Sequence, residues 1–134
     1  MIQWYVYLMN QKLALITGAS SGIGFHLTKA LLNKGYKVIG CSRRSEPLTQ
    51  LEKQFPGNFI GLAGDVCDDQ FQNQLLLKAK ELGSLDLLIN NAGVGYFTHS
   101  DEMPMSKVEQ LIATNILSLT KLSIKAIPFL KQSK

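Results

Sequence analysis

A glycine-rich turn that joins an apolar run to a helical pattern constrains the fold of this chain more than any other feature. Residues 13–17 form a short apolar run, typical of a strand buried on both faces of a parallel sheet. The sequence T-G-A-S-S-G-I-G follows at residues 17–24, and apolar residues then recur at helical spacing until Gly35 supplies a stop. These apolar residues are Ile23, Leu27, Ala30 and Leu31. Strand, glycine turn and helix in this order are typical of a dinucleotide-binding fold.

The remainder of the chain continues the alternation of strands and helices. The pattern predicts strands at 37–41, 58–63 and 85–90 and helices at 23–33, 46–55, 68–82 and about 106–130. Pro128 disturbs only the last turn of the long final helix. Alternation at these lengths predicts right-handed crossovers, and therefore an α/β fold with a doubly wound parallel sheet of four visible strands. Such an open sheet places its ligand crevice beyond the carboxyl ends of its strands.

Composition narrows the class of protein. The 134 residues are 46% hydrophobic and 18% charged, which predicts one soluble globular domain able to bury a core. The formal charge of +4 is spread along the chain apart from the pair Arg43-Arg44, so nucleic acid is not a predicted partner. Cys41 and Cys67 fall at predicted strand ends without metal-ligand or CxxC spacing. We predict buried, reduced thiols and no metal site.

Residues 1–11 are expected to be an extension that precedes a domain at 12–134. Residues 1–9 are apolar, but they lack a basic leading region and a cleavage site, and they are too short to span a bilayer. Secretion and membrane insertion are therefore disfavoured, and a cytoplasmic location is expected. Met9 directly precedes a polar triplet and the first strand, so a native start at Met9 is a further hypothesis.

Each glycine of the turn has its own predicted use. Gly18 permits a tight turn, Gly22 lets the backbone approach a pyrophosphate, and Gly24 lets the helix pack against the strand. The amides of the helix N-terminus face the same anion, and Ser20 and Ser21 can donate to phosphate or ribose oxygens. The alternative is an ordinary strand-to-helix loop that uses glycine for geometry alone.

Two further motifs accompany the turn. Its spacing is TGxxxGxG instead of GxGxxG, Asp65-Val66 follows the third predicted strand, and Asn90-Asn91-Ala92-Gly93 follows the fourth. With these motifs in this order, the chain resembles the N-terminal part of the short-chain dehydrogenase/reductase family. The resemblance covers nearly everything after residue 12. It implies a Rossmann-like sheet that stops after about four strands and the long helix in fifth position.

The resemblance also implies a site for a nicotinamide dinucleotide. Asp65 would accept a hydrogen bond from the adenine amino group, and Val66 would pack on the ring. Asn90 is expected to brace adjacent strands, while the next three residues line the ribose. For Asp65 the alternative is a carboxylate at a helix N-terminus, favoured by the helix dipole. The predicted cofactor-binding residues are Gly18, Ser20, Ser21, Gly22, Ile23, Gly24, Ser42, Arg43, Arg44, Asp65, Val66, Asn91, Ala92 and Gly93.

The end of the second strand favours NADP(H) over NAD(H). Enzymes that prefer NAD usually place a carboxylate there, whereas a 2′-phosphate calls for arginine. This chain has the sequence C-S-R-R at residues 41–44 and no acid until Glu46. A guanidinium binds a phosphate bidentately, and Ser42 adds a hydroxyl donor. The alternative is a solvated basic turn.

The family's catalytic pair, a tyrosine with a lysine four residues later, is not found in this sequence. The four tyrosines and the residues four positions after them are Tyr5 and Met9, Tyr7 and Gln11, Tyr36 and Gly40, and Tyr96 and Ser100. Asn115 aligns with a helix asparagine that supports the family's proton relay through water and a helix bend. Its alternative is a mid-helix polar residue. Ser118 and Ser123 come too early to stand for the family's serine.

The leading hypothesis is therefore the NADP(H)-binding portion of an oxidoreductase that interconverts carbonyl and hydroxyl groups of a small substrate. The alternatives are a non-catalytic nucleotide-binding or dimerising module and a remnant of a broken gene. Apolar residues surround most of the long helix, and the resemblance implies a homo-oligomer that packs through it. The strand at 85–90, internal in the family's sheet, would be an unpaired edge here, which predicts marginal stability or aggregation.

Overall fold

Strands and helices alternate along the chain as the sequence predicts. The computed structural model describes residues 11–133. Its elements are β1 (Leu13–Thr17), α2 (Gly22–Asn33), β2 (Lys37–Ser42), α3 (Glu46–Gln54), β3 (Phe59–Ala63), α4 (Asp69–Leu82), β4 (Leu87–Ile89), α5 (Met105–Ile112), η1 (Ala113–Ser118) and α6 (Leu119–Leu130). The hypothesis of a start at Met9 lies outside the described residues, as does the predicted extension up to residue 10.

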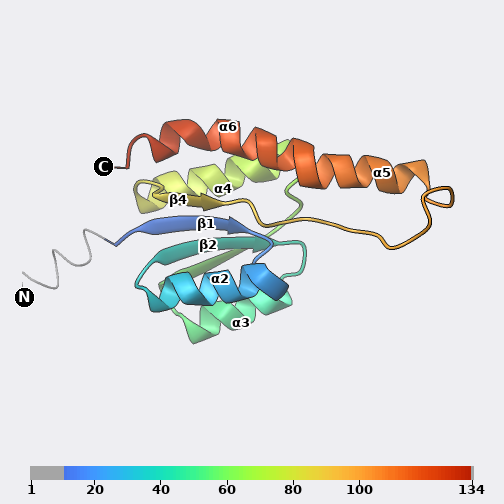
Figure 1. Ribbon diagram of the computed structural model, residues 1–134. Helices are drawn as coiled ribbons and strands as arrows, with labels where there is room; N and C mark the ends of the chain where they lie inside the picture. The colour runs from blue at the N-terminus through green and yellow to red at the C-terminus, as the bar shows by residue number, and fades with distance from the viewer. Residues whose placement is uncertain (1–10, 134) are drawn as a thin grey trace, which may run out of the picture.

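The strands form one parallel sheet in the order β3-β2-β1-β4. β1 is central, and its side chains alternate between two cores. Leu13 and Leu15 pack with residues of α4 and α6, whereas Ala14 and Ile16 pack with residues of α2 and α3. Figure 1 shows these two helix layers on opposite faces of the sheet. The predicted α/β fold, a Rossmann-like doubly wound parallel sheet, is therefore confirmed.

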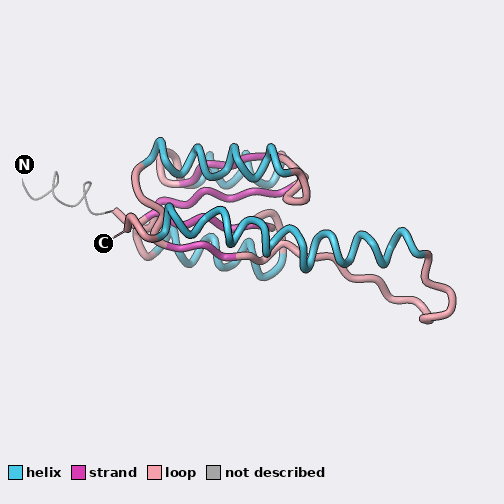
Figure 2. Tube along the Cα trace, turned by 90° about the horizontal axis from the view of Figure 1, so that it is seen from above, coloured by secondary structure: helices cyan, strands magenta, loops and turns pink. Residues whose placement is uncertain are grey.

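The long C-terminal helix, predicted as a single element, contains a wider turn. α5, η1 and α6 follow one another directly, and η1 is π-helical. Within η1 the hydroxyl of Ser118 donates to the carbonyl of Thr114 at 2.7 Å. Such a turn changes which side chains face the sheet. α5 buries none of its residues, and Figures 1 and 2 show it extending past the sheet together with the loop that precedes it.

The fourth strand is shorter than predicted. Its ladder with β1 covers Leu87–Ile89 instead of 85–90. Leu85 is buried before the strand begins, and the Asp86 carboxylate accepts from the Leu13 amide at 2.7 Å. Asn90 does not brace two strands: its amide donates to Ser123 Oγ of α6 at 2.8 Å. Among the described residues β4 is thus an edge of the sheet, as predicted, and the effect of this edge on stability stays a prediction.

Helix α2 turns a different face to the sheet than its apolar spacing suggests. Ile23 is 74% exposed and Leu27 is 37% exposed, whereas Gly24, Thr28 and Leu32 are buried. The cause is steric. A Cβ at position 24 would lie 2.1 Å from the carbonyl oxygen of Gly18, so only glycine permits this approach, and the approach fixes the rotation of the helix.

We expect Gly24→Ala to destabilise the fold by about 1–3 kcal/mol, the usual penalty for overpacking. The added Cβ would strike backbone, and this penalty outweighs the gain in helix propensity of at most about 1 kcal/mol. The midpoint of urea unfolding measures the effect. Gly95→Ala is the matched control, because a Cβ there would meet nothing within 4 Å. Equal midpoints for the two variants would contradict the steric argument.

Candidate functional site

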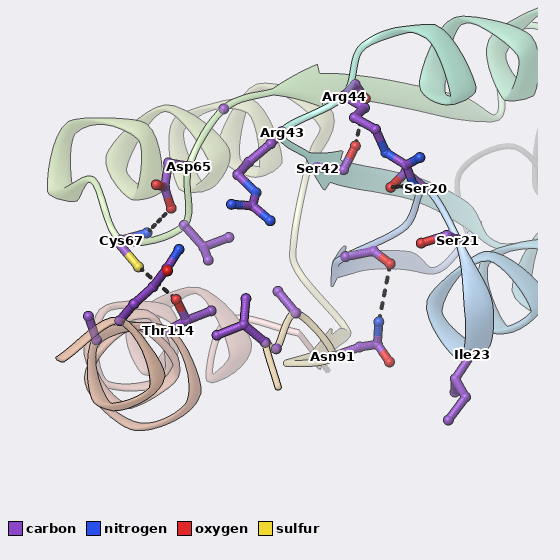
Figure 3. Close-up of a pocket in the computed structure, with 18 residues that line it drawn as sticks. Ser20, Ser21, Ile23, Ser42, Arg43, Arg44, Asp65, Cys67, Asn91 and Thr114 are labelled. Carbon is purple, nitrogen blue, oxygen red and sulfur yellow. Dashed lines mark hydrogen bonds between the residues drawn. The ribbon is translucent and has the colours of Figure 1, made fainter. Parts of the chain in front are cut away.

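A cavity of about 930 Å³ opens beyond the carboxyl ends of the strands. Figure 3 shows side chains from the loops after β1, β2 and β3, from the loop after β4, and from the long helix around it. All predicted cofactor-binding residues line this cavity except Gly22 and Gly24. The lining residues that sequence reasoning missed are Gly64, Cys67, Val94, Gln110, Ala113 and Thr114.

The glycine turn leaves the start of α2 free to meet a ligand. Gly18 and Gly22 have φ values of +72° and +56°, in the left-handed region that glycine tolerates best. Ser21, the residue before the first helical turn, makes no capping hydrogen bond. In α4, by contrast, the Asp68 carboxylate accepts from the Gln70 amide at 2.9 Å. The amides at the start of α2 are therefore available to an anion in the cavity.

Asn91 holds the glycine turn in place with its side chain. Its Nδ2 donates to the carbonyl oxygens of Thr17 at 3.1 Å and Gly18 at 3.2 Å. In return, the backbone amides of Asn91 and Ala92 each donate to Thr17 Oγ1 at 3.0 Å. The strand-bracing role predicted for Asn90 therefore belongs to its neighbour. Asn91 still lines the cavity, with its amide nitrogen committed to the turn.

Two arginines stand at the end of β2. Figure 3 shows Arg43 extending into the cavity, and Arg44 lies beside Ser20, to whose Oγ it donates at 3.4 Å. The hydroxyl of Ser42, predicted as a donor to the ligand, donates instead to the Arg44 carbonyl at 2.7 Å. It therefore shapes the turn that carries the arginines and offers a ligand only an acceptor.

The loop after β3 forms the opposite part of the cavity. Asp65 Oδ1 accepts from the Cys67 amide at 2.9 Å, and Val66 is largely buried. Asp68, not Asp65, caps α4, which weakens the alternative reading of Asp65 as a capping carboxylate. Asp65 thus faces the cavity with its remaining acceptor capacity.

One of the two thiols differs from prediction. Cys67 lies in the loop between β3 and α4, where it is exposed, and its Sγ lies 3.5 Å from Thr114 Oγ1. Cys41, inside β2, is fully buried as predicted. Burial raises the pKa of the Cys41 thiol from its ordinary value of 9.0 to about 12, partly offset by a hydrogen bond from the Gly18 backbone.

Asn115 acts on the loop that follows the fourth strand. It lies in the π-helical segment η1, which agrees with the helix irregularity implied by the resemblance. Its Oδ1 accepts from the Val94 amide and its Nδ2 donates to the Val94 carbonyl, both at 2.8 Å. The side chain does not line the cavity. Asn115 therefore holds the backbone of Val94, the residue after Gly93.

The described part of the chain shows neither a metal-binding cluster nor a membrane-spanning helix. Between residues 11 and 133, no three His, Cys, Asp or Glu side chains gather so as to hold a metal ion. In the same stretch, no helix is both long enough and apolar enough to cross a membrane.

Comparison with known proteins identifies the family. A family model described as short chain dehydrogenase matches residues 12–134. The chain belongs to the short-chain dehydrogenase/reductase family. The sequence motifs that suggested this family, the glycine turn, Asp65-Val66 and the Asn90–Gly93 stretch, thus led to the right assignment.

Relatives of this short-chain dehydrogenase/reductase chain include two bacterial proteins named probable NADP-dependent dehydrogenases. One, from Haemophilus influenzae, is 35% identical over 122 residues, which are 90% of this chain and 48% of the relative. The other, from Dichelobacter nodosus, is 39% identical over 105 residues, 77% of this chain and 99% of the relative. The crystal structure of the KRED1-Pglu enzyme superposes with a TM-score of 0.87 at 31% identity, covering 92% of this chain and 53% of that one. The chain thus spans about half the length of the Haemophilus relative and of the solved enzyme.

Only one of the two thiols is expected to react with Ellman's reagent in the native protein at pH 8. Cys67 is exposed, whereas Cys41 is buried and keeps its proton. Cys67→Ser should abolish the native signal, and denaturant should reveal the second thiol. Two equally fast native thiols would contradict the burial of Cys41.

The stability of the protein is expected to fall between pH 9.0 and about 12, because the Cys41 thiol ionises in the unfolded chain before it does in the folded one. The contribution of the buried neutral thiol to stability is therefore lost as pH rises through that window.

Proposed function

We propose that this chain is the NADP(H)-binding portion of a short-chain oxidoreductase that interconverts carbonyl and hydroxyl groups by hydride transfer. The observation that carries the proposal is the meeting of an uncapped helix N-terminus with two arginines in one cavity. Helix N-termini and bidentate arginine donors both bind phosphate groups. The cavity supplies the first from α2 and the second from Arg43 and Arg44.

The residues of the cavity fit a dinucleotide carrying a 2′-phosphate. The pyrophosphate would lie against the start of α2, where Ser20, Ser21 and Ile23 line the cavity. Arg43, with the Arg44–Ser20 pair beside it, would hold the 2′-phosphate. Asp65 and Val66 would receive the adenine, and the backbone of Ala92 and Gly93 the second ribose. The NADP-dependent names of two relatives support the choice of NADP(H) over NAD(H).

The chain's own residues bind and orient the cofactor but do not include the proton-transferring pair. When bound, the nicotinamide would supply or accept the hydride. None of the tyrosines is followed by lysine four residues later, so we propose that these 134 residues bind nucleotide without turnover. Asn115 would contribute indirectly, by fixing Val94 next to the cavity. The substrate would be a small carbonyl or alcohol, and two free thiols agree with a reducing compartment such as the cytoplasm.

Self-association is the second part of the proposal, and an exposed stripe on the long helix supports it. Ile112, Ile116, Ile124 and Ile127 recur every three, four or eight residues and are between 46% and 64% exposed. An exposed apolar stripe on a helix is typical of a contact between proteins. We propose that a second copy covers it and forms a homo-oligomer.

Arg43→Ala is expected to weaken NADPH binding by about 1–3 kcal/mol, the usual worth of a charged hydrogen bond. Binding of NADH, which lacks the 2′-phosphate, should change little. Fluorescence titration of both nucleotides measures the two affinities in the same variant. Lys53→Ala, which removes an exposed cation from α3 outside the cavity, is the matched control. An unchanged NADPH affinity in Arg43→Ala would refute the assignment.

Ile116→Lys is expected to shift the protein toward a monomer, because a charge in the middle of a buried apolar contact has no partner. Light scattering coupled to size-exclusion chromatography reports the mass at several concentrations. Leu77→Lys, on α4 with a similar exposed fraction of 58%, serves as the control. If both variants keep the mass of the unmodified protein, the stripe is not the contact.

A further inference from the structure

A buried glutamine joins two sides of the cavity. Gln72 lies near the start of α4 and is only 1% exposed. Its Nε2 donates to the carbonyl of Val66 at 2.8 Å and to the carbonyl of Ser118 at 2.9 Å. Val66 belongs to the loop after β3, and Ser118 ends η1, whose first two residues line the cavity. One amide therefore connects the β3 loop to the π-helical segment.

Packing alone does not explain a glutamine at this position. The two carbonyl acceptors fix the orientation of the amide, because the flipped group would place oxygen against oxygen. Among the described residues, Oε1 then has no hydrogen-bond partner although it is buried. An apolar side chain of similar size would fill the space without an unpaired oxygen, but it would leave both carbonyls without this donor.

The other polar links across this junction are weaker. Lys121 and Lys125 of α6 each lie 2.9 Å from the Asp69 carboxylate, but all three groups are substantially exposed and screened by solvent. The contact between the Cys67 thiol and Thr114 is long and involves a weak donor or acceptor. Gln72 is therefore the strongest polar connection between the β3 loop and η1 within residues 11–133.

We propose that Gln72 is a positioning residue that sets the spacing between the β3 loop and η1 and thereby aligns Asp65 with the adenine ring. Asp65 directly precedes Val66, whose carbonyl Gln72 holds. The position of the Asp65 carboxylate therefore depends on the backbone that Gln72 fixes. The alignment rests on the proposed nucleotide function, whereas the connection between the two segments does not.

Hydrogen exchange on the ligand-free protein tests the connection. In Gln72→Met, amides at 64–70 and 113–119 should exchange faster, while those of β1 and β2 keep their rates. Gln74→Met, on the exposed side of the same helix, is the matched control and should change neither segment. A second variant, Gln72→Asn, keeps the amide but is too short to reach both carbonyls, so it should loosen only one segment. Unchanged exchange, or an equal acceleration throughout the chain, would overturn the proposal.

The choice between two nucleotides tests the alignment. NADPH carries the adenine amino group that would donate a hydrogen bond to Asp65, and its deaminated hypoxanthine analogue lacks this group. Gln72→Met should lower the preference for NADPH over the analogue about fivefold, the factor that corresponds to one net hydrogen bond. General loosening would weaken both ligands equally and keep the preference, which would overturn the alignment. If the unmodified protein binds neither nucleotide, the proposed function fails, and hydrogen exchange alone decides whether Gln72 connects the segments.

Discussion

The close approach of helix α2 to the end of β1 is the constraint on which the rest of the structure depends. Gly24 leaves no room for a Cβ beside the Gly18 carbonyl, and the same carbonyl accepts from the Asn91 side chain. The glycine turn, the start of α2 and the distant loop after β4 therefore meet at one oxygen atom. Because the contact is made by backbone, it tolerates little adjustment. The rotation of α2, the direction of its first amides and the path of the loop after β4 all follow from it.

The cavity has one electropositive side and one side that offers a hydrogen-bond acceptor. Parallel strands bring the loops after β1, β2 and β3 to the same edge of the sheet. The helix N-terminus and the arginines make one side electropositive, while Asp65 stands on the other as a hydrogen-bond acceptor. A ligand with anionic groups at one end and an amino group at the other has one favourable orientation there. This arrangement supports the proposed binding of a dinucleotide over that of a simple phosphate.

Local patterns predicted the fold well, because each strand and turn carries its own signal. The apolar run of β1 and the glycines after it specify a strand, a turn and a helix within a dozen residues. The helix face of α2 was not predictable from hydrophobicity, since the Gly18–Gly24 contact overrides the apolar positions Ile23 and Leu27. The extent of β4 depended on which strands pair with it, and that is information from distant parts of the chain.

The candidate site was predictable where motifs lie in loops and unpredictable where a helix supplies the wall. Thr114 and Gln110 belong to a helix that is apolar around much of its circumference, so no pattern marks the side that faces the cavity. The π-helical turn moves that side further from ideal spacing. Gln72 left no signal at all, because a polar residue near the start of a helix is ordinarily solvated. Its two carbonyl partners are brought together only by the packing of α4 against α6.

Stability and ligand binding are connected through the same elements. The edge of β4 and the isoleucine stripe both expose groups that a folded protein usually covers. The cavity reaches this edge, because residues 91–94 after β4 line it together with the loops after β1, β2 and β3. A nucleotide bound there would join the β1 turn, the β2 arginines and the β3 loop, and would favour the folded state by mass action. A bound nucleotide would therefore stabilise the glycine turn and the loop after β4 together, because the Asn91 side chain joins the two.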